Sequence, residues 1–253
     1  MTKKLFSMAM LAMIATSFVA CDKDDDNGND NANANTNVVD LGLPSGAKWA
    51  KKNLGATNAW DRGDYYAWGE TETKAEEYYW TTYKYCNGTD NTLTKYNYDA
   101  SCGTVDNKKV LEPSDDVATI TLGNDYSIPT IAEWDELSNQ CYWVWTKNYN
   151  EQKVSGYIVY RAKADSDKGM KVYENETPSK SYTLSDTHIF LPVTGCRFHS
   201  DIKYEWDGYY WSSSIDEQNP KYAMIRYFFN TEVYTTRYDS RCYGFTVRPV
   251  KRP

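Results

Sequence analysis

Hydrophobic and polar positions alternate most clearly between Gly208 and Val250, near the end of the chain. Four short runs rich in aromatic and β-branched residues lie there between turn-forming residues: Tyr209–Ser214, Tyr222–Phe229, Glu232–Arg237 and Tyr243–Val250. Alternate side chains of a strand share one face, so Arg226 marks the face of its run that we expect to meet solvent. Asn230 and Thr231 stand where a two-residue loop would join antiparallel strands. The pattern predicts an antiparallel meander that closes the domain.

A helical period occurs in the middle of the chain. Thr130, followed three residues later by Glu133, predicts an N-terminal capping box. One stripe at helical spacing then carries Ile131, Trp134, Leu137 and Cys141. A shorter helix is predicted from Ser114 as N-cap to Gly123 as stop signal. Strands before and after two helices predict an α+β layer architecture.

The first 20 residues are typical of an export signal. Lys3 and Lys4 precede the apolar run Leu5–Val19, which is too short to span a bilayer stably. Ala20 before Cys21 resembles the lipobox of bacterial lipoproteins, in which the cysteine becomes the lipidated first residue. We therefore expect a lipoprotein signal peptide at residues 1–20 and lipidation of Cys21. The alternative is an ordinary secretory signal with a chance cysteine.

Residues 21–37 are acidic and rich in asparagine, so they predict a disordered tether. An acidic cluster directly after the cysteine resembles the export signal of Bacteroidota-type lipoproteins. That resemblance implies a lipid-anchored protein of the outer membrane that faces the cell exterior. A calcium-binding loop in this stretch is rejected, because Gly28 falls one place late and Asn33 stands where a glutamate is needed.

Residues 38–253 are enough for one sizeable domain. The whole chain has 28 basic and 35 acidic residues, a net charge of −7, and losing the two lysines of the leader would take it to −9. Nucleic acid requires a concentrated basic face, so it is excluded as a partner.

Several segments, taken in order, resemble one known family. They are VDLGLPSGAKWAKKNLGA, GDYYAWGET, YKYC, PTIAEWDEL, TLSDTHIFLP, GYYWSSS and GFTVRPV. Together they resemble the Fibrobacter succinogenes major paralogous domain family over about Val38 to Val250. The resemblance implies a C-type-lectin-like fold, in which two helices flank a small twisted antiparallel sheet with long loops. The calcium-dependent sugar motifs of true C-type lectins do not occur here in the right order, so we expect neither metal nor cofactor.

Six cysteines, less a lipidated Cys21, leave an odd number. Cys86 and Cys102 each end an aromatic segment, and a disulfide between them would close the polar loop from 87 to 100. A disulfide between Cys196 and Cys242 requires that the strand before Cys196 and the C-terminal strand are neighbours in the sheet. The lectin-like fold allows this arrangement. Cys141, on the helical stripe, is the expected buried and unpaired thiol.

Aromatic residues are unusually frequent, with 9 Trp, 23 Tyr and 7 Phe. Several of these aromatic residues lie close to turn-forming residues, where core packing cannot easily use all of them. Candidate ligand contacts are Tyr204, Trp206, Asp207 and Tyr209, and after them Tyr78, Tyr79 and Trp80. These residues favour a non-catalytic surface module that binds a glycan or a protein. The alternatives are a structural or adhesive part of a surface assembly, such as a fimbrial tip, and an enzyme of the formylglycine-generating or glycosidase kind.

An enzyme is the least favoured of these alternatives. The chain has neither a metalloprotease HExxH motif nor a phosphate-binding glycine-rich loop. His188 is expected to pack or cap, and His199 with Asp201 could form an acid–base pair without a matching nucleophile motif. The formylglycine-generating type uses a cysteine pair near its C-terminus, which Cys196 and Cys242 could mimic, although a structural disulfide explains them more simply. We predict no catalytic residues.

Overall fold

The computed structural model describes residues 38–75 and 77–253. The predicted signal peptide, the lipidated Cys21 and the tether lie outside the described residues. Within the described part, no helix is both long enough and apolar enough to cross a membrane.

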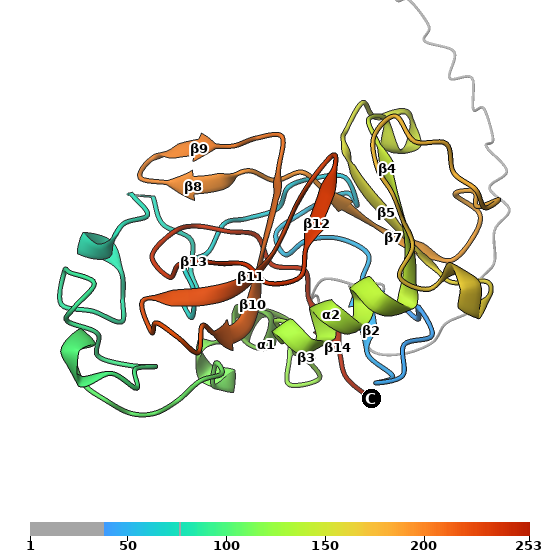
Figure 1. The fold of residues 1–253 in the computed structure, drawn as a ribbon. Helices are drawn as coiled ribbons and strands as arrows, with labels where there is room; N and C mark the ends of the chain where they lie inside the picture. Colours follow the sequence, from blue (N-terminus) through green and yellow to red (C-terminus); the bar gives the residue numbers. More distant parts are fainter. Residues whose placement is uncertain (1–37, 76) are drawn as a thin grey trace, which may run out of the picture. The chain divides into compact units, whose positions relative to one another are not determined.

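The described residues form four sheets and two α-helices (Figure 1). The strands are β1 (Val38–Val39), β2 (Lys48–Ala50), β3 (Tyr126–Ser127), β4 (Cys141–Thr146), β5 (Gly156–Arg161), β6 (Lys171–Val172), β7 (His188–Pro192), β8 (Cys196–Phe198), β9 (Asp201–Lys203), β10 (Gly208–Ile215), β11 (Tyr222–Phe229), β12 (Glu232–Tyr234), β13 (Tyr238–Ser240) and β14 (Val250–Lys251). The helices are α1 (Val117–Leu122) and α2 (Ile131–Gln140). Short 3-10 turns occur at Trp80–Thr82, Ala100–Cys102, Pro113–Asp115, Tyr149–Glu151 and Asp165–Asp167.

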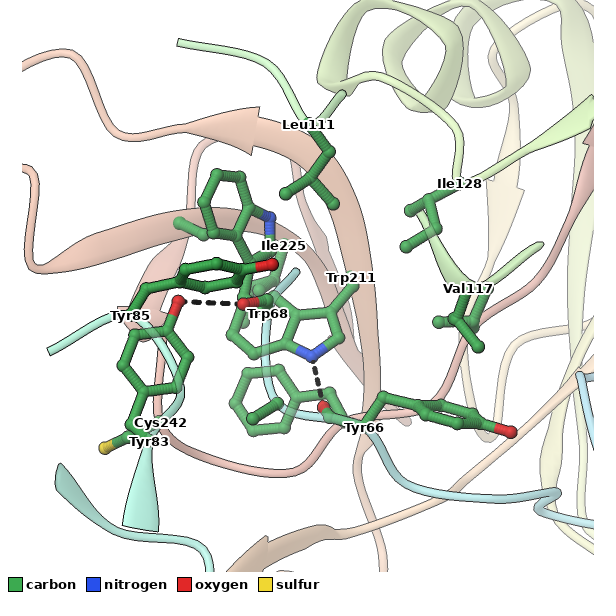
Figure 2. Close-up of a cluster of buried hydrophobic side chains, with 14 of the residues drawn as sticks. Tyr66, Trp68, Tyr83, Tyr85, Leu111, Val117, Ile128, Trp211, Ile225 and Cys242 are labelled. Atoms are coloured by element: carbon green, nitrogen blue, oxygen red, sulfur yellow. Dashed lines mark hydrogen bonds between the residues drawn. The ribbon is translucent and has the colours of Figure 1, made fainter. Parts of the chain in front are cut away.

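The antiparallel pair β10–β11 separates two hydrophobic cores. Side chains alternate across a strand, so Trp211 and Ile225 enter the first core, whereas Tyr210 and Phe228 enter the second. Figure 2 shows the first core, in which the Trp211 indole donates a hydrogen bond to the Tyr66 carbonyl at 2.7 Å. Because both faces of the pair are covered, its strands are aromatic-rich on both sides.

The prediction that the Arg226 face of β11 meets solvent is therefore wrong. Arg226 is fully buried, and its guanidinium meets the Asp135 carboxylate of α2 at 2.6 Å. A periodic pattern identifies the two faces of a strand but not which of them is covered, and here α2 covers the face that carries the arginine.

The helix α2 begins as predicted. Thr130 caps it, and the reciprocal bonds with Glu133 complete the capping box. Trp134 and Leu137 of the stripe are fully buried in the second core. The shorter helix stops at Gly123 as expected, but its cap is Asp116, two residues after the predicted Ser114, and a 3-10 turn precedes it.

The other strands form three further sheets. The second core is closed by a sheet of order β6-β4-β5-β7, and a sheet of order β1-β2-β14-β3 gathers the two ends of the domain. The hairpin β8–β9 is a sheet of its own, drawn in orange above β10 and β11 in Figure 1.

The predicted C-type-lectin-like arrangement, two helices flanking one small sheet, is wrong. Strand accounts for 31% of the structure and helix for 14%, and the strands are divided among four sheets. The helix α2 packs on β10, β11 and β4, while α1 contacts the short strand β3 and buries Val117 and Ala118 in the first core. The predicted two-residue loop at Asn230–Thr231 is confirmed by the pairing of Phe229 with Glu232.

The last strand of the predicted meander is also wrong. The segment 243–249 makes isolated bridges, and Val250 joins β2 and β3 in a different sheet. One arginine just before this segment and one within it explain its path. Arg241 donates to the carbonyls of Lys95, Tyr96 and Pro220, and Arg248 donates to those of Ala50 and Phe190. Both guanidinium groups are fully buried, so they tie the segment to the loops that surround it.

Neither predicted disulfide forms. All five cysteines of the described residues are buried, free thiols. Leu93 bridges Cys86 on one side and Gly103 on the other, so its backbone lies between Cys86 and Cys102. Two strand spacings of about 4.8 Å separate these cysteines by about 10 Å, which is beyond the reach of a disulfide.

Cys196 and Cys242 are separated by their register. The bridge between Arg197 and Gly244 sets Cys196 opposite Phe245, whereas Cys242 lies three residues before Phe245, in the turn that precedes the bridge. Burial raises the pKa of Cys196 to about 12 and the pKa of Cys242 well above its usual range. Cys141 is fully buried, as predicted, and burial raises its pKa to about 12.

Candidate ligand-binding cleft

The two predicted groups of ligand contacts lie at opposite ends of the β8–β9 hairpin. The tip of the hairpin, at His199, forms a backbone bridge with Tyr78. The base of the hairpin leads through residues 204–207 into β10. The structure therefore places the two groups apart along one hairpin.

The turn at residues 204–207 (the Trp206 turn) is fixed by its backbone. The Asp207 amide donates to the Tyr204 carbonyl, and the Asp207 carbonyl accepts from the amides of Thr194 and Gly195, each bond 2.9–3.0 Å long. Tyr204 takes a positive φ of 52°, which turns the chain sharply. These bonds leave the Trp206 side chain 80% exposed and that of Tyr204 63% exposed.

Trp206 borders a cleft of about 440 Å³, the Trp206 cleft. Its aromatic walls are Trp206 itself, Trp145 from β4 and Phe229 from the end of β11. Trp145 and Phe229 are half-buried and rest on Tyr157 and Tyr234 respectively. The cleft thus has one fully presented indole and two aromatic side chains that are already supported from behind.

Polar groups of the cleft are held by neighbouring side chains. Glu174 uses one carboxylate oxygen for the Lys147 ammonium group and the other for the Asn230 amide. The Glu205 carboxylate forms an ion pair with the Arg62 guanidinium, with 2.8 Å between the two groups. The bond to Lys147, and then that to Asn230, lower the pKa of Glu174 from its usual range. Fixed partners give these polar groups defined positions before any ligand arrives.

Asp207 differs from the other two carboxylates of the cleft. It accepts a hydrogen bond from the Tyr227 hydroxyl at 2.9 Å. Burial raises the pKa of Asp207, and the bond from Tyr227 opposes that rise. An ionised carboxylate at this position is partly desolvated, so additional hydrogen-bond donors would stabilise it.

A larger hollow of about 560 Å³ lies elsewhere, beside residues 70–75, Thr82 and Lys84. Its lining consists of threonine, glutamate, lysine and one alanine, without an aromatic side chain. Binding sites combine apolar or aromatic walls with a few polar groups. The Trp206 cleft has this composition, so we favour it over the larger hollow.

Two of the predicted ligand contacts, Tyr209 and Tyr78, are buried in the first core. Tyr209 is 8% exposed and packs on Tyr227 and Phe245, so its prediction as a ligand contact is wrong. Tyr78 is 1% exposed, and its hydroxyl donates to the Tyr65 carbonyl, so its prediction is wrong as well. Both rings are packed against core residues and leave little surface for a ligand.

Tyr79 and Trp80 are half-buried and lie at the far end of the hairpin. Tyr79 stacks on the His199 ring at 4.5 Å, and His199 in turn meets Glu77 at 2.5 Å. Trp80 meets the ring of Tyr83 edge to face. Tyr79 thus packs on the hairpin tip, and neither Tyr79 nor Trp80 lines the Trp206 cleft.

Sequence reasoning missed Trp145, Phe229, Glu174, Lys147 and Asn230. Lys147 and Asn230 directly follow strands, Trp145 lies in β4, and Phe229 ends the predicted strand run Tyr222–Phe229. Nothing in the periodicity indicates that β4 and β11 end beside the Trp206 turn. Only the spacing of Asn230 and Thr231, which marks the end of β11, could have pointed to this place.

The remaining candidates for chemistry have structural roles. His188 bonds to the Asp186 carbonyl and the Tyr149 hydroxyl, as expected of a packed residue. His199 pairs with Glu77, so the possible pair with Asp201 does not form; Asp201 meets Lys203 instead. Across residues 38–75 and 77–253, no group of three or more His, Cys, Asp or Glu side chains could hold a metal ion.

Comparison with known proteins gives no family model, no curated protein and no solved structure that matches this chain. The resemblance to the major paralogous domain family therefore stays a prediction.

Proposed function

We propose that the protein is a non-catalytic binding module that recognises a glycan through the Trp206 cleft. One observation carries the proposal: a tryptophan that is 80% exposed stands on a rigid turn beside two further aromatic walls. A flat indole suits the apolar face of a pyranose ring, and fixed carboxylate and amide groups suit its hydroxyls. Leaving so large a side chain in water has no evident benefit for folding.

The state of the polar groups supports binding over catalysis. Both carboxylate oxygens of Glu174 are already bonded, which makes it a poor base for an attacking water. Chemistry of the formylglycine-generating type needs reactive thiols, whereas Cys196 and Cys242 are buried with raised pKa values. A glycosidase would release products from the bound glycan, which chromatography of the incubated ligand detects.

We also propose that Cys21 anchors the protein by lipid to the outer face of the outer membrane. The motive is the signal-like leader with Ala20 before the cysteine and the acidic cluster after it. Each buried CH₂ of an acyl chain contributes about 0.8 kcal/mol, so the native protein should partition with detergent. Added protease should remove it from intact cells, and Cys21→Ala should abolish the lipid. Recovery of native protein in the soluble periplasmic fraction would contradict the anchor.

A structural or adhesive role is the second candidate. The strand β9 is an exposed edge, which could pair with another chain. Asp201 and Lys203 form an ion pair there, and charged residues on an edge discourage such pairing. A structural or adhesive role is therefore less well supported than glycan binding in the Trp206 cleft.

A glycan array probed with the purified protein tests the proposal. We expect binding that is lost in Trp206→Ala and retained in Tyr238→Ala. Tyr238 is a matched control because it is 47% exposed and lies on β13, outside the cleft. Binding that survives Trp206→Ala would reject the cleft. Capture of an envelope protein without any glycan would reject the ligand class.

A further inference from the structure

The inference concerns which glycans the cleft accepts, and it rests on the proposed function. Charged side chains that line the cleft are one lysine and three carboxylates, Lys147 against Glu174, Glu205 and Asp207. Acidic groups therefore outnumber basic ones where a ligand would lie.

The three carboxylates are not equally compensated. Lys147 neutralises Glu174, and Arg62 neutralises Glu205 from outside the lining. Asp207 accepts a hydrogen bond from the neutral Tyr227 hydroxyl and, within the described part of the chain, forms no ion pair. A net negative charge is thus left at the residue that follows Trp206.

Two carboxylate oxygens are open to a ligand. Oε1 of Glu205 and Oδ1 of Asp207 accept no hydrogen bond from any residue in 38–75 or 77–253, whereas Oε2 of Glu205 pairs with Arg62 and Oδ2 of Asp207 accepts from Tyr227. An ionised carboxylate can only accept hydrogen bonds. A ligand beside these oxygens must therefore bring donors, and hydroxyl groups are the donors that a glycan supplies.

We propose that the cleft selects glycans by charge and takes hydroxyl-rich chains that lack carboxylate and sulfate groups. Like charges brought together at a partly desolvated site repel each other strongly. A uronic acid or a sulfate stacked on Trp206 would lie against Asp207 and Glu205. A neutral chain would instead donate to the same two oxygens.

The test uses neutral glucans with free primary hydroxyls, one β-1,3-linked and one α-1,4-linked, each beside its C6-carboxylated derivative. Titration at low salt should show the carboxylated chain bound at least about tenfold more weakly, with the difference narrowing as salt rises. Equal or tighter binding of the carboxylated chain overturns the selection. On a broad array, hits confined to uronic or sulfated glycans overturn it as well.

Two variants locate the effect. Glu205→Gln removes one negative charge and frees Arg62, and Asp207→Asn removes the uncompensated charge. Each should reduce the ratio of neutral to carboxylated affinity severalfold, and an unchanged ratio in both would contradict the assignment. Trp206→Ala separates the two proposals. If it abolishes binding while both forms of glucan bind the wild type equally, charge selection fails and glycan binding stands. If no glycan binds the wild type, both fail.

Discussion

Two aromatic segments lie at the two ends of the β8–β9 hairpin, and they have opposite fates. At the tip, Tyr78 is 1% exposed and Tyr79 and Trp80 are half-buried. At the base, Trp206 is 80% and Tyr204 63% exposed. Both segments are rich in aromatic residues and acidic groups, so composition does not separate them.

What separates them is the backbone around each. Gly244 passes so close to the Tyr78 ring that a Cβ on the glycine would lie 2.7 Å from it. The Trp206 turn is instead closed by its own backbone bonds and those of Thr194 and Gly195, and its outer side chains stay exposed. An aromatic residue is thus structural at the tip and available to a ligand at the base.

The largest effect should come from Tyr78→Ala. Removing a buried aromatic ring leaves a cavity in the first core, and we expect a loss of about 4 kcal/mol in the free energy of unfolding. Urea denaturation measures it. Glycan affinity of the fraction that stays folded should not change, and a specific loss of affinity without a loss of stability would break the distinction between tip and base.

Tyr79→Ala should have a smaller effect. The ring stacks on His199 at the surface of the hairpin tip, and such a pair contributes about 1 kcal/mol beyond the area it buries. Thermal denaturation should therefore show a modest decrease in Tm. Tyr79→Phe keeps the ring and serves as the control; if it were as unstable as the alanine variant, the stacking explanation would be wrong.

Lowering the pH should weaken glycan binding. Burial raises the pKa of Asp207, so its carboxylate becomes protonated, and loses an acceptor site, above the usual range for aspartate. The effect of Asp207 on stability has the opposite direction. A carboxyl group whose pKa is raised in the folded state opposes folding when it is ionised, so protonation of Asp207 does not unfold the protein. Titrations between about pH 7 and about pH 4 should show the decline in the wild type and a flatter profile in Asp207→Asn. A wild-type profile that stays flat would contradict this role.

Reducing agents should have almost no effect on stability. All five cysteines of the described residues are free thiols, so dithiothreitol has no disulfide to reduce among these residues. We expect equal Tm values with and without it, and peptide mapping without reduction should recover Cys86, Cys102, Cys196 and Cys242 as single thiols. A marked decrease in Tm on reduction would show that the predicted disulfides form after all.

Local signals could be predicted from the sequence. The capping box at Thr130 and Glu133, the two-residue loop at Asn230–Thr231 and the strand run Tyr222–Phe229 depend on neighbouring residues, and each occurs as expected. Trp206 was also predicted to be a contact, because it lies in a turn. Trp206 borders the cleft, and its role as a ligand contact stays a prediction.

The errors arise where distant segments decide the outcome. Arg226 is buried because α2 supplies Asp135, and Tyr209 is buried because Phe245 lies beside it. The cysteine pairs fail because Leu93 lies between Cys86 and Cys102 and because the bridge between Arg197 and Gly244 sets Cys196 opposite Phe245 rather than Cys242. None of these neighbours can be read from the spacing of residues within a single strand.

The most direct test of the central claim is a calorimetric titration of the glycan that binds best on the array into the wild type, Trp206→Ala and Tyr238→Ala, with urea denaturation of each. Because Trp206 is 80% exposed, we expect Trp206→Ala to change the free energy of unfolding by no more than about 0.5 kcal/mol. Its affinity should fall at least about tenfold, which corresponds to about 1.4 kcal/mol, while Tyr238→Ala keeps wild-type affinity. A Trp206→Ala variant that binds like the wild type would contradict the account.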